Sequence, residues 1–271
     1  MADVRTGSVD VSGGSLYFEV AGEGPAITLI HPGLWDSRTW DPQVPVLVEA
    51  AFRVIRYDVR GYGRSSRLTG EPYSHVRDLE TLLDALDVPR TIMVGCSMGG
   101  AIAIDFTLEH PDRVAALVVA ASGLGGFEAL EEEEDWWAAW NAPVEEAVAA
   151  GDLERAEDLR LVVWAPLGTD DDAGSRIRQI AFDNIHELTM DESAEEELEP
   201  PAALRLGEID VPTLVLVAEH DPPFMRRCDE LIGREVLDGR LVTIDADHVV
   251  NVRNPEAFDA AVLPFLAEFA R

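Results

Sequence analysis

The sequence predicts an α/β protein with a mostly parallel central sheet, helices on both faces of that sheet, and a helical cap insertion. Two observations predict the sheet. Short apolar runs alternate with helical patterns along most of the chain, and five of these runs are almost continuously apolar. Continuous apolar runs are typical of parallel strands that are covered on both faces, and the intervening helices make the crossover connections. A third observation, one long segment without this alternation, predicts the cap.

The individual strands and helices follow from these patterns in chain order. We expect strands at residues 16–20, 27–30, 54–57, 92–95, 116–120, 213–218 and 241–244. The last five of them should be buried on both faces. We expect helices at residues 74–86, where Ser74 is a suitable N-cap, at residues 98–110, which end before a proline, and from Pro255 onward.

Residues 127–206 are expected to form the helical cap. This segment contains helical patches, turn signals and four of the six tryptophans, but no alternation of strands and helices. The core domain then comprises residues 1–126 and 207–271. The alternative is a solvated helical extension of the main domain that forms no separate cap.

Length and composition limit the class of protein. A chain of 271 residues can bury the core of one large domain. No apolar stretch approaches the roughly 20 residues of a membrane span, and the first residues lack the pattern of a signal peptide. The two cysteines, Cys96 and Cys228, do not suggest a disulfide framework. We therefore expect a cytoplasmic protein with reduced thiols.

The chain is strongly acidic. Its net charge is −31, and all 21 basic residues are arginines. This balance argues against nucleic acid and anionic membranes as partners, because both bind clustered positive charge. Residues 128–199 hold 23 acidic residues against four arginines, hence a net charge of −19. A GC-rich genome or adaptation to high salt would each give this composition. Measurements of melting temperature and activity in low salt and in molar salt distinguish the two explanations.

Two acidic runs in the cap are expected to be structural. Residues 131–135 should form a solvated helix face. Residues 170–172 lack the alternating ligand spacing and the glycine of a calcium loop. We expect neither a metal nor a cofactor.

The most informative motif is G-x-S-x-G at residues 95–99, with Ser97 at its centre. An apolar run precedes it and a helical run follows it. In this strand–turn–helix context the motif is a nucleophile elbow, which holds a serine at the tip of a strand. The helix that begins after Ser97 directs free N–H groups and its positive dipole end at an oxyanion formed there.

A nucleophilic serine needs a base and an orienting acid. In an open parallel sheet these residues sit on loops beyond the carboxyl ends of strands. Three of the six histidines follow expected strands, and His248 follows the last one. We expect Asp221, on the preceding loop, to pair with His248, while Glu219 and Asp247 stay open as alternative acids. The other two histidines that follow strands are His31 and His220.

With these residues in place, the chain resembles the α/β-hydrolase fold family over nearly its whole length. H-P-G-L at residues 31–34 is similar to the family's H-G oxyanion loop, and D-V-R-G-Y-G-R-S at residues 58–65 to its D-x-R-G-x-G-x-S turn. The elbow at residues 95–100 matches the family's elbow motif, and Asp221 and His248 fall where the family has its acid and its histidine. Four motifs in the family's order make the resemblance specific.

The resemblance implies an oxyanion hole made by the backbone N–H groups of Met98 and Gly33. Pro32 departs from the family's usual glycine, and proline has no N–H to donate. The second donor is therefore Gly33 or Leu34. His31 and the turn at residues 58–65 are expected to shape these loops, and Cys96 to be a small buried filler.

The residues and the resemblance together imply a cofactor-independent serine hydrolase. It would cleave a small, neutral and apolar carboxylic ester or lactone through an acyl-enzyme on Ser97, with His248 as base and Asp221 as orienting acid. The acidic cap disfavours anionic substrates. Five tryptophans are expected to line the substrate pocket, although those of the cap could instead pack it onto the core: Trp35, Trp136, Trp137, Trp140 and Trp164.

Three other functions stay open. The elbow also resembles those of enol-lactonases and carbon–carbon bond hydrolases of aromatic degradation, but the glycine-rich loop of the carbon–carbon hydrolases is absent. A cofactor-free perhydrolase or haloperoxidase uses the same triad, and a ligand receptor built on a hydrolase scaffold can retain it. A small molecule is the expected partner, and the sequence does not indicate an oligomeric state.

Overall fold

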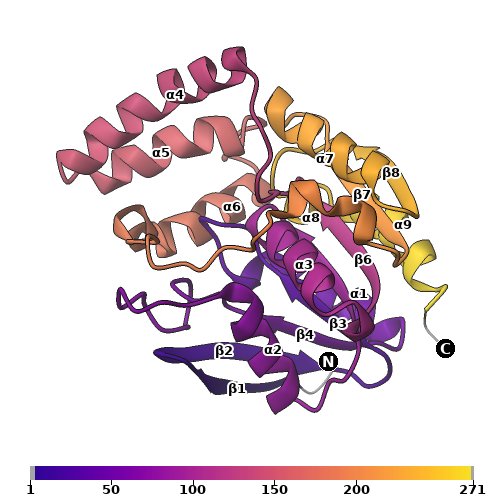
Figure 1. Ribbon diagram of the computed structural model, residues 1–271. Helices are drawn as coiled ribbons and strands as arrows, with labels where there is room; N and C mark the ends of the chain where they lie inside the picture. The colour runs from indigo at the N-terminus through magenta and orange to yellow at the C-terminus, as the bar shows by residue number, and fades with distance from the viewer. Residues whose placement is uncertain (1–3, 270–271) are drawn as a thin grey trace.

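An eight-stranded sheet forms the centre of the computed structural model, which describes residues 4–269 (Figure 1). The strand order is β1-β2-β4-β3-β5-β6-β7-β8, with β1 and β2 antiparallel to their neighbours and all other pairs parallel. This confirms the expected fold class. The strands are β1 (Val4–Val11), β2 (Gly14–Ala21), β3 (Ala26–Ile30), β4 (Arg53–Tyr57), β5 (Thr91–Cys96), β6 (Val114–Ala120), β7 (Thr213–Ala218) and β8 (Gly239–Ile244).

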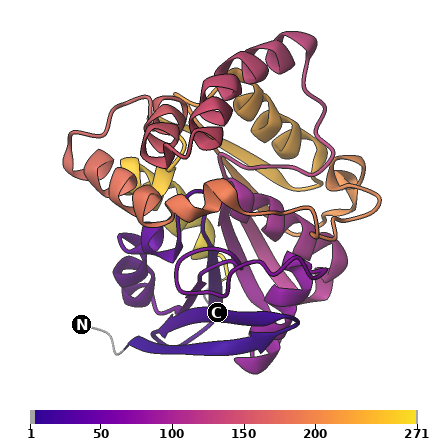
Figure 2. The same ribbon diagram turned by 90° about the vertical axis from the view of Figure 1, so that its left-hand side faces the viewer.

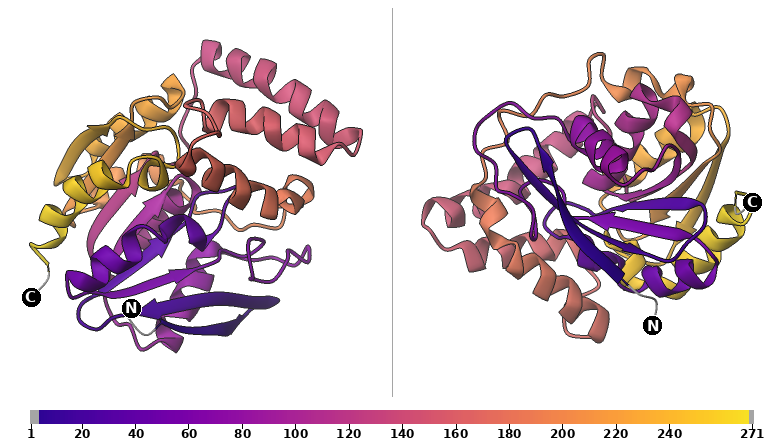
Figure 3. Two further views of the ribbon diagram at one scale, coloured as in Figure 1. Left: turned by 180° about the vertical axis from the view of Figure 1, so that it is seen from behind. Right: turned by 90° about the horizontal axis from the view of Figure 1, so that it is seen from below.

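Helices cover both faces of the sheet (Figures 1 and 3). On one face lie α2 (His75–Ala85), α3 (Met98–Glu109) and α7 (Pro223–Glu235), which share a buried cluster with the strands. The other face carries α1 (Gln43–Glu49), α8 (Val250–Arg253) and α9 (Pro255–Leu266). Two layers of apolar packing therefore fix the central strands, whose carboxyl ends carry the candidate site residues.

The helix ends match the capping signals in the sequence. The Ser74 side chain accepts a hydrogen bond from the Arg77 N–H at the start of α2, as expected. At the start of α9, the Asn254 side chain accepts from the Ala257 N–H behind Pro255. Side-chain oxygens thus satisfy N–H groups that have no partner within their helix.

Two edge strands differ from the sequence-based expectation. No strand was expected at β1, whose polar sequence lies largely exposed and pairs antiparallel with β2 (Figure 2). The expectation that the last strand is covered on both faces was wrong. β8 pairs only with β7 and leaves Leu241 45% and Val242 37% exposed. An apolar run does not reveal whether its strand has one neighbour or two, and that number decides its burial.

Three helices between β6 and β7 lie over one end of the sheet (Figures 1 and 3). They are α4 (Glu131–Ala149), α5 (Leu153–Trp164) and α6 (Asp172–Asp183), and short 3₁₀ turns follow at Ile185–Thr189, Ala202–Leu204 and Leu206–Glu208. Asp171 caps α6 by accepting from the Gly174 N–H at 2.6 Å, so this member of the acidic run 170–172 has a structural role. Within residues 4–269, no helix combines the length and apolar character needed to cross a bilayer.

Candidate active site

The turn between β5 and α3 holds Ser97 in a strained conformation. Its φ of 53° and ψ of −117° are rarely adopted by a residue with a side chain, and its hydroxyl does not cap the helix. The flanking glycines are needed for space. A Cβ on Gly95 would lie 2.1 Å from the Gly99 carbonyl oxygen, and one on Gly99 would lie 2.2 Å from the Ile30 oxygen. The residues 95–99 therefore form the sharp turn that the motif predicts.

His248 and Asp221 pair beside this turn. His248 Nδ1 lies 2.9 Å from Asp221 Oδ2, and the two side chains are 3% and 0% exposed. The Cys96 thiol donates to the His248 carbonyl oxygen at 3.5 Å, which ties the histidine loop to the end of β5. Burial raises the pKa of Cys96 well above its usual value, so this thiol stays protonated.

The alternative acids have other positions. Asp247 is fully buried and binds Arg253 with both of its oxygens at 3.0 Å. Glu219 is exposed. His220 turns away from Asp221 and places its Nε2 2.8 Å from Asp245 Oδ1. Of the acids considered from the sequence, only Asp221 contacts His248.

The oxyanion loop follows β3, and its backbone is unusual at Leu34. Leu34 has a positive φ of 69°, in the left-handed region that residues with side chains rarely adopt. A Cβ placed on Gly33 would lie 3.9 Å from Met98 Cβ, so this loop and the first residue of α3 adjoin each other. The Met98 N–H begins a helix and has no carbonyl partner within it. Gly33 and Leu34 stay the two candidates for the second donor.

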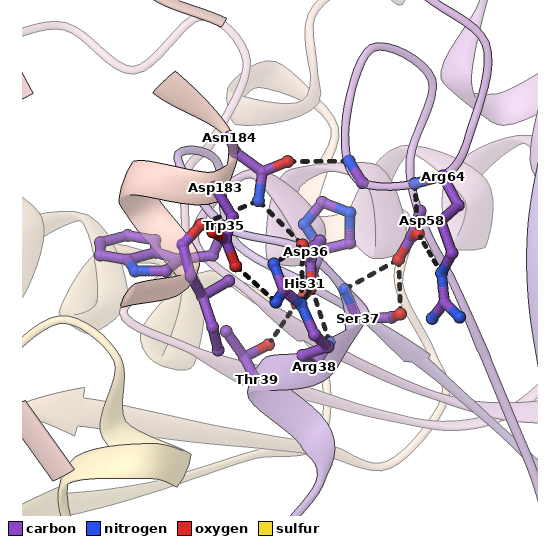
Figure 4. Close-up of polar contacts among 12 residues, drawn as sticks. His31, Trp35, Asp36, Ser37, Arg38, Thr39, Asp58, Arg64, Asp183 and Asn184 are labelled. Atoms are coloured by element: carbon purple, nitrogen blue, oxygen red, sulfur yellow. Dashed lines mark hydrogen bonds and ion pairs between the residues drawn. The ribbon is translucent and has the colours of Figure 1, made fainter. Parts of the chain in front are cut away.

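His31 holds the oxyanion loop against the turn at residues 58–65. Its Nε2 accepts from the Val59 N–H at 2.9 Å, and its Nδ1 donates to the Pro32 carbonyl oxygen at 2.8 Å. Complete burial lowers the pKa of His31 and keeps the ring neutral. On the same turn, the Asp58 carboxylate accepts from the Ser37 N–H and the Arg64 N–H (Figure 4). His31 thus has the structural role expected from its position.

Asn184 joins the cap to both of these loops, a link that sequence reasoning missed. Its Nδ2 donates to Asp36 Oδ2 at 2.8 Å, and its Oδ1 accepts from the Gly63 N–H at 2.8 Å (Figure 4). Arg38 also binds Asp36 and reaches Asp183 at the end of α6. Asparagine commonly makes such bonds, but Gly63 and Asn184 are 121 positions apart, so the sequence does not reveal this one.

The five tryptophans expected to line a pocket occupy different environments. Trp35 is fully buried and donates from its indole N–H to the Ile177 oxygen of α6, which is a packing position between core and cap. Trp164 lies on His248, with ring centroids 4.4 Å apart. Trp136 and Trp137 are each 39% exposed, and Trp136 stacks on Trp140.

A cavity of about 530 Å³ opens between the oxyanion loop and the cap helices. Leu34 and Trp164 line it, together with an apolar wall of Trp137, Trp140 and Val144. Arg160 and Glu187 also line it and form an ion pair. Because Glu187 neutralises the guanidinium, the cavity offers apolar and aromatic surface without a free positive charge from Arg160.

A second and more acidic cavity, of about 700 Å³, is lined in part by Met98. Asp105 and Glu195 line it, and burial raises the pKa of each to about 7. A carboxyl group that must share a crowded acidic site holds its proton more tightly, because a further charge is costly there. The two cavities therefore differ strongly in polarity.

One group of side chains within residues 4–269 has donor atoms close enough to hold a metal ion. Ligand atoms of Glu219, His220 and Asp245 lie within 4.8 Å of one another. All three residues are exposed, and His220 Nε2 already makes a hydrogen bond with Asp245. Exposed acidic groups of this kind are common in a chain with 52 acidic residues.

Comparisons with known proteins show the family to which the chain belongs. A model of the alpha/beta hydrolase fold family matches residues 25–255. The chain is 28% identical to a putative carbamate hydrolase RutD from Caulobacter sp. (strain K31), over 97% of this chain and 98% of that protein. It is also 28% identical to 3-oxoadipate enol-lactonase 1 of Acinetobacter baylyi, over 86% and 85% of the two chains.

The structural comparison agrees. A hydrolase from Pseudomonas aeruginosa PA01 superposes with a TM-score of 0.75 and 28% sequence identity, covering 97% of this chain and 98% of that one. The family match spans both halves of the sheet, from β3 to the start of α9, and includes the elbow and the loops of Asp221 and His248. This chain therefore belongs to the α/β-hydrolase fold family and is a hydrolase.

Proposed function

We propose that the protein is a serine hydrolase that cleaves a small, neutral and apolar carboxylic ester or lactone through an acyl-enzyme on Ser97. The observation that carries this proposal is the buried hydrogen bond between His248 Nδ1 and Asp221 Oδ2, 2.9 Å long, beside an elbow that presents Ser97. A buried carboxylate on Nδ1 fixes the tautomer that leaves Nε2 free to accept a proton.

The proposed reaction uses these groups in order. His248 Nε2 removes the Ser97 proton as the hydroxyl oxygen attacks the carbonyl carbon, and Asp221 stabilises the imidazolium. The backbone N–H groups of Met98 and of Gly33 or Leu34 bind the oxyanion, each contributing about 3 kcal/mol. The alcohol leaves with the proton from His248, and water, activated by the same histidine, releases the acid from Ser97.

The substrate class follows from the cavity beside the oxyanion loop. Its wall of Trp137, Trp140 and Val144 suits an apolar group, and Glu187 neutralises its one arginine, Arg160. The names of the full-length relatives also support hydrolysis of a carbonyl–heteroatom bond, because one is an enol-lactonase and the other a putative carbamate hydrolase. We favour esters and lactones because the apolar cavity provides few groups to bind a polar leaving group.

Replacement of the nucleophile tests this proposal. Ser97→Ala should lower kcat for a neutral p-nitrophenyl ester by roughly 10⁶-fold, because the acyl-enzyme can no longer form. Fluorophosphonate labelling, located by mass spectrometry, should disappear with the same change. Ser193→Ala, at an exposed position of the cap, is the matched control and should retain both ester turnover and fluorophosphonate labelling. Ester turnover by Ser97→Ala within tenfold of wild type, at an unchanged melting temperature, would refute the assignment.

A further inference from the structure

Tyr62 places its hydroxyl beside the oxyanion loop. A Cβ built on Gly33 would lie 3.7 Å from the Tyr62 hydroxyl oxygen and 3.9 Å from Met98 Cβ. The hydroxyl therefore adjoins the space between the two loops that carry the proposed backbone donors. The ring itself is 4% exposed and packs edge-on against His31, with centroids 5.4 Å apart.

This hydroxyl has no protein partner. Across residues 4–269, no hydrogen bond joins the Tyr62 hydroxyl to another group, and its oxygen is not among the fully buried side-chain atoms that lack a partner. The hydroxyl oxygen therefore stays accessible, although the residue as a whole is only 4% exposed. An oxygen of a ligand at the oxyanion site can accept a hydrogen bond from it.

The hydroxyl is also in the right protonation state to donate. Burial raises the pKa of Tyr62 well above 10, and the nearby Glu187 and Glu192 carboxylates raise it further, while Arg160 opposes them. At neutral pH the group is thus a protonated phenol. It can donate one hydrogen bond to an oxygen that gains negative charge.

The backbone around Tyr62 fixes its direction. Gly61 and Gly63, on either side, have φ values of 94° and 50°, which make the tight turn possible. The Tyr62 N–H donates to the Val59 oxygen at 3.0 Å, and the Val59 N–H donates to His31. The same histidine holds Pro32, so Tyr62 and the oxyanion loop are anchored to one buried ring.

We propose that the Tyr62 hydroxyl donates a third hydrogen bond to the substrate carbonyl oxygen, beside the backbone donors of Met98 and the oxyanion loop. The proposal rests on the proposed function, because it requires an acyl substrate on Ser97. The bond strengthens as negative charge develops on that oxygen, so Tyr62 stabilises the transition state more than the bound substrate. It also supplements a loop in which Pro32 offers no N–H.

Tyr62→Phe isolates the hydroxyl, because the ring and its packing remain. We expect kcat for a neutral p-nitrophenyl ester to fall about 100- to 1,000-fold with little change in KM, as for loss of an oxyanion donor. Tyr73→Phe is the control, since Tyr73 is similarly buried at 5% but packs edge-on against His75 instead of His31. This control should keep the wild-type kcat.

A second measurement reads the oxyanion directly. A trifluoromethyl ketone adds to Ser97 and forms a tetrahedral oxyanion, so its Ki for Tyr62→Phe should rise by the factor by which kcat/KM falls. The inference is wrong if the variant keeps the wild-type kcat and Ki. It is also wrong if the variant loses activity and melting temperature together while its Ki does not rise by a matching factor. These outcomes leave the proposed function standing if wild type turns over the ester and Ser97→Ala does not. Absence of turnover by wild type refutes both.

Discussion

Asp221 is held in place by burial and by its hydrogen bond with His248. One of its oxygens accepts from His248, and the other, Oδ1, has no hydrogen-bond partner among the described residues. The neighbouring Asp229 is also fully buried, and burial raises its pKa well above the usual value. A protonated Asp229 adds no second negative charge to this buried region.

Removal of the Asp221 charge tests its proposed role. Asp221→Asn should lower kcat about 10⁴-fold, because an amide can donate to His248 Nδ1 and favour the wrong tautomer. Glu219, an exposed residue on the same loop, provides the control, and the kcat of Glu219→Gln should be close to that of wild type. The measurement is kcat for a neutral ester together with the melting temperature. A larger loss from Glu219→Gln than from Asp221→Asn would assign the acid to Glu219.

The contact between His248 and Asp221 was easier to predict from the sequence than the contacts of the residues around it. Ser97 lies in a motif of fixed spacing, and His248 and Asp221 follow strands whose apolar runs are clear. Tyr62 lies within a motif that was interpreted as a turn, and no local pattern gives the direction of a tyrosine hydroxyl. Asn184 contacts residues far away in the chain, so its role depends on how the cap packs.

Among the elements, the buried strands were predicted from the sequence more accurately than the exposed ones. The five central strands β3 to β7 were expected from apolar runs, and their ends differ from the expected ones by at most two residues. The outer strands were harder to predict, because β1 has a polar sequence and β8 an apolar one, although both are exposed. The boundaries of the cap, 127–206, stay a prediction, since α4 to α6 have no strand to mark where the core resumes.

Helix α5 of the cap contains a buried acid with a consequence for stability. Glu157 is 1% exposed, lies 3.5 Å from the Arg160 guanidinium, and leaves Oε1 without a partner in the described part of the chain. Burial raises its pKa from 4.5 to about 7. The folded protein therefore holds this proton more tightly than the unfolded chain, and stability falls as pH rises from about 4.5 to about 7.

Glu157→Gln removes this dependence while preserving the side-chain volume. At pH 8 the variant should be more stable than wild type by about 1–3 kcal/mol, because wild type then buries a charge. At pH 5 Glu157 is protonated in the folded protein, and the two melting temperatures should nearly coincide. Glu146→Gln, on the exposed side of α4, should show no such difference between the two pH values. An equal effect of Glu157→Gln at both pH values would contradict this linkage.

At the scale of the whole molecule, the dominant property is the net charge of −31. The arginines cannot neutralise it, because the cap alone has 23 acidic residues against four arginines between residues 128 and 199. The cap covers the end of the sheet where Ser97 lies, so a substrate passes through a region of negative potential on its way to the proposed site. Such a potential lowers the local concentration of anions and leaves neutral molecules unaffected.

A matched pair of esters measures this effect. In a buffer of 0.01 M ionic strength, p-nitrophenyl butyrate should have a kcat/KM at least about tenfold higher than that of p-nitrophenyl hemisuccinate, which carries a carboxylate on an acyl chain of similar length. At 1 M NaCl the ratio should shrink, because the screening length falls from about 30 Å to about 3 Å. A ratio that does not change with salt would place the selectivity in the cavity contacts of Trp137, Trp140 and Val144. Preference for the hemisuccinate at low salt would instead mean that a cationic group in the site outweighs the charge of the cap.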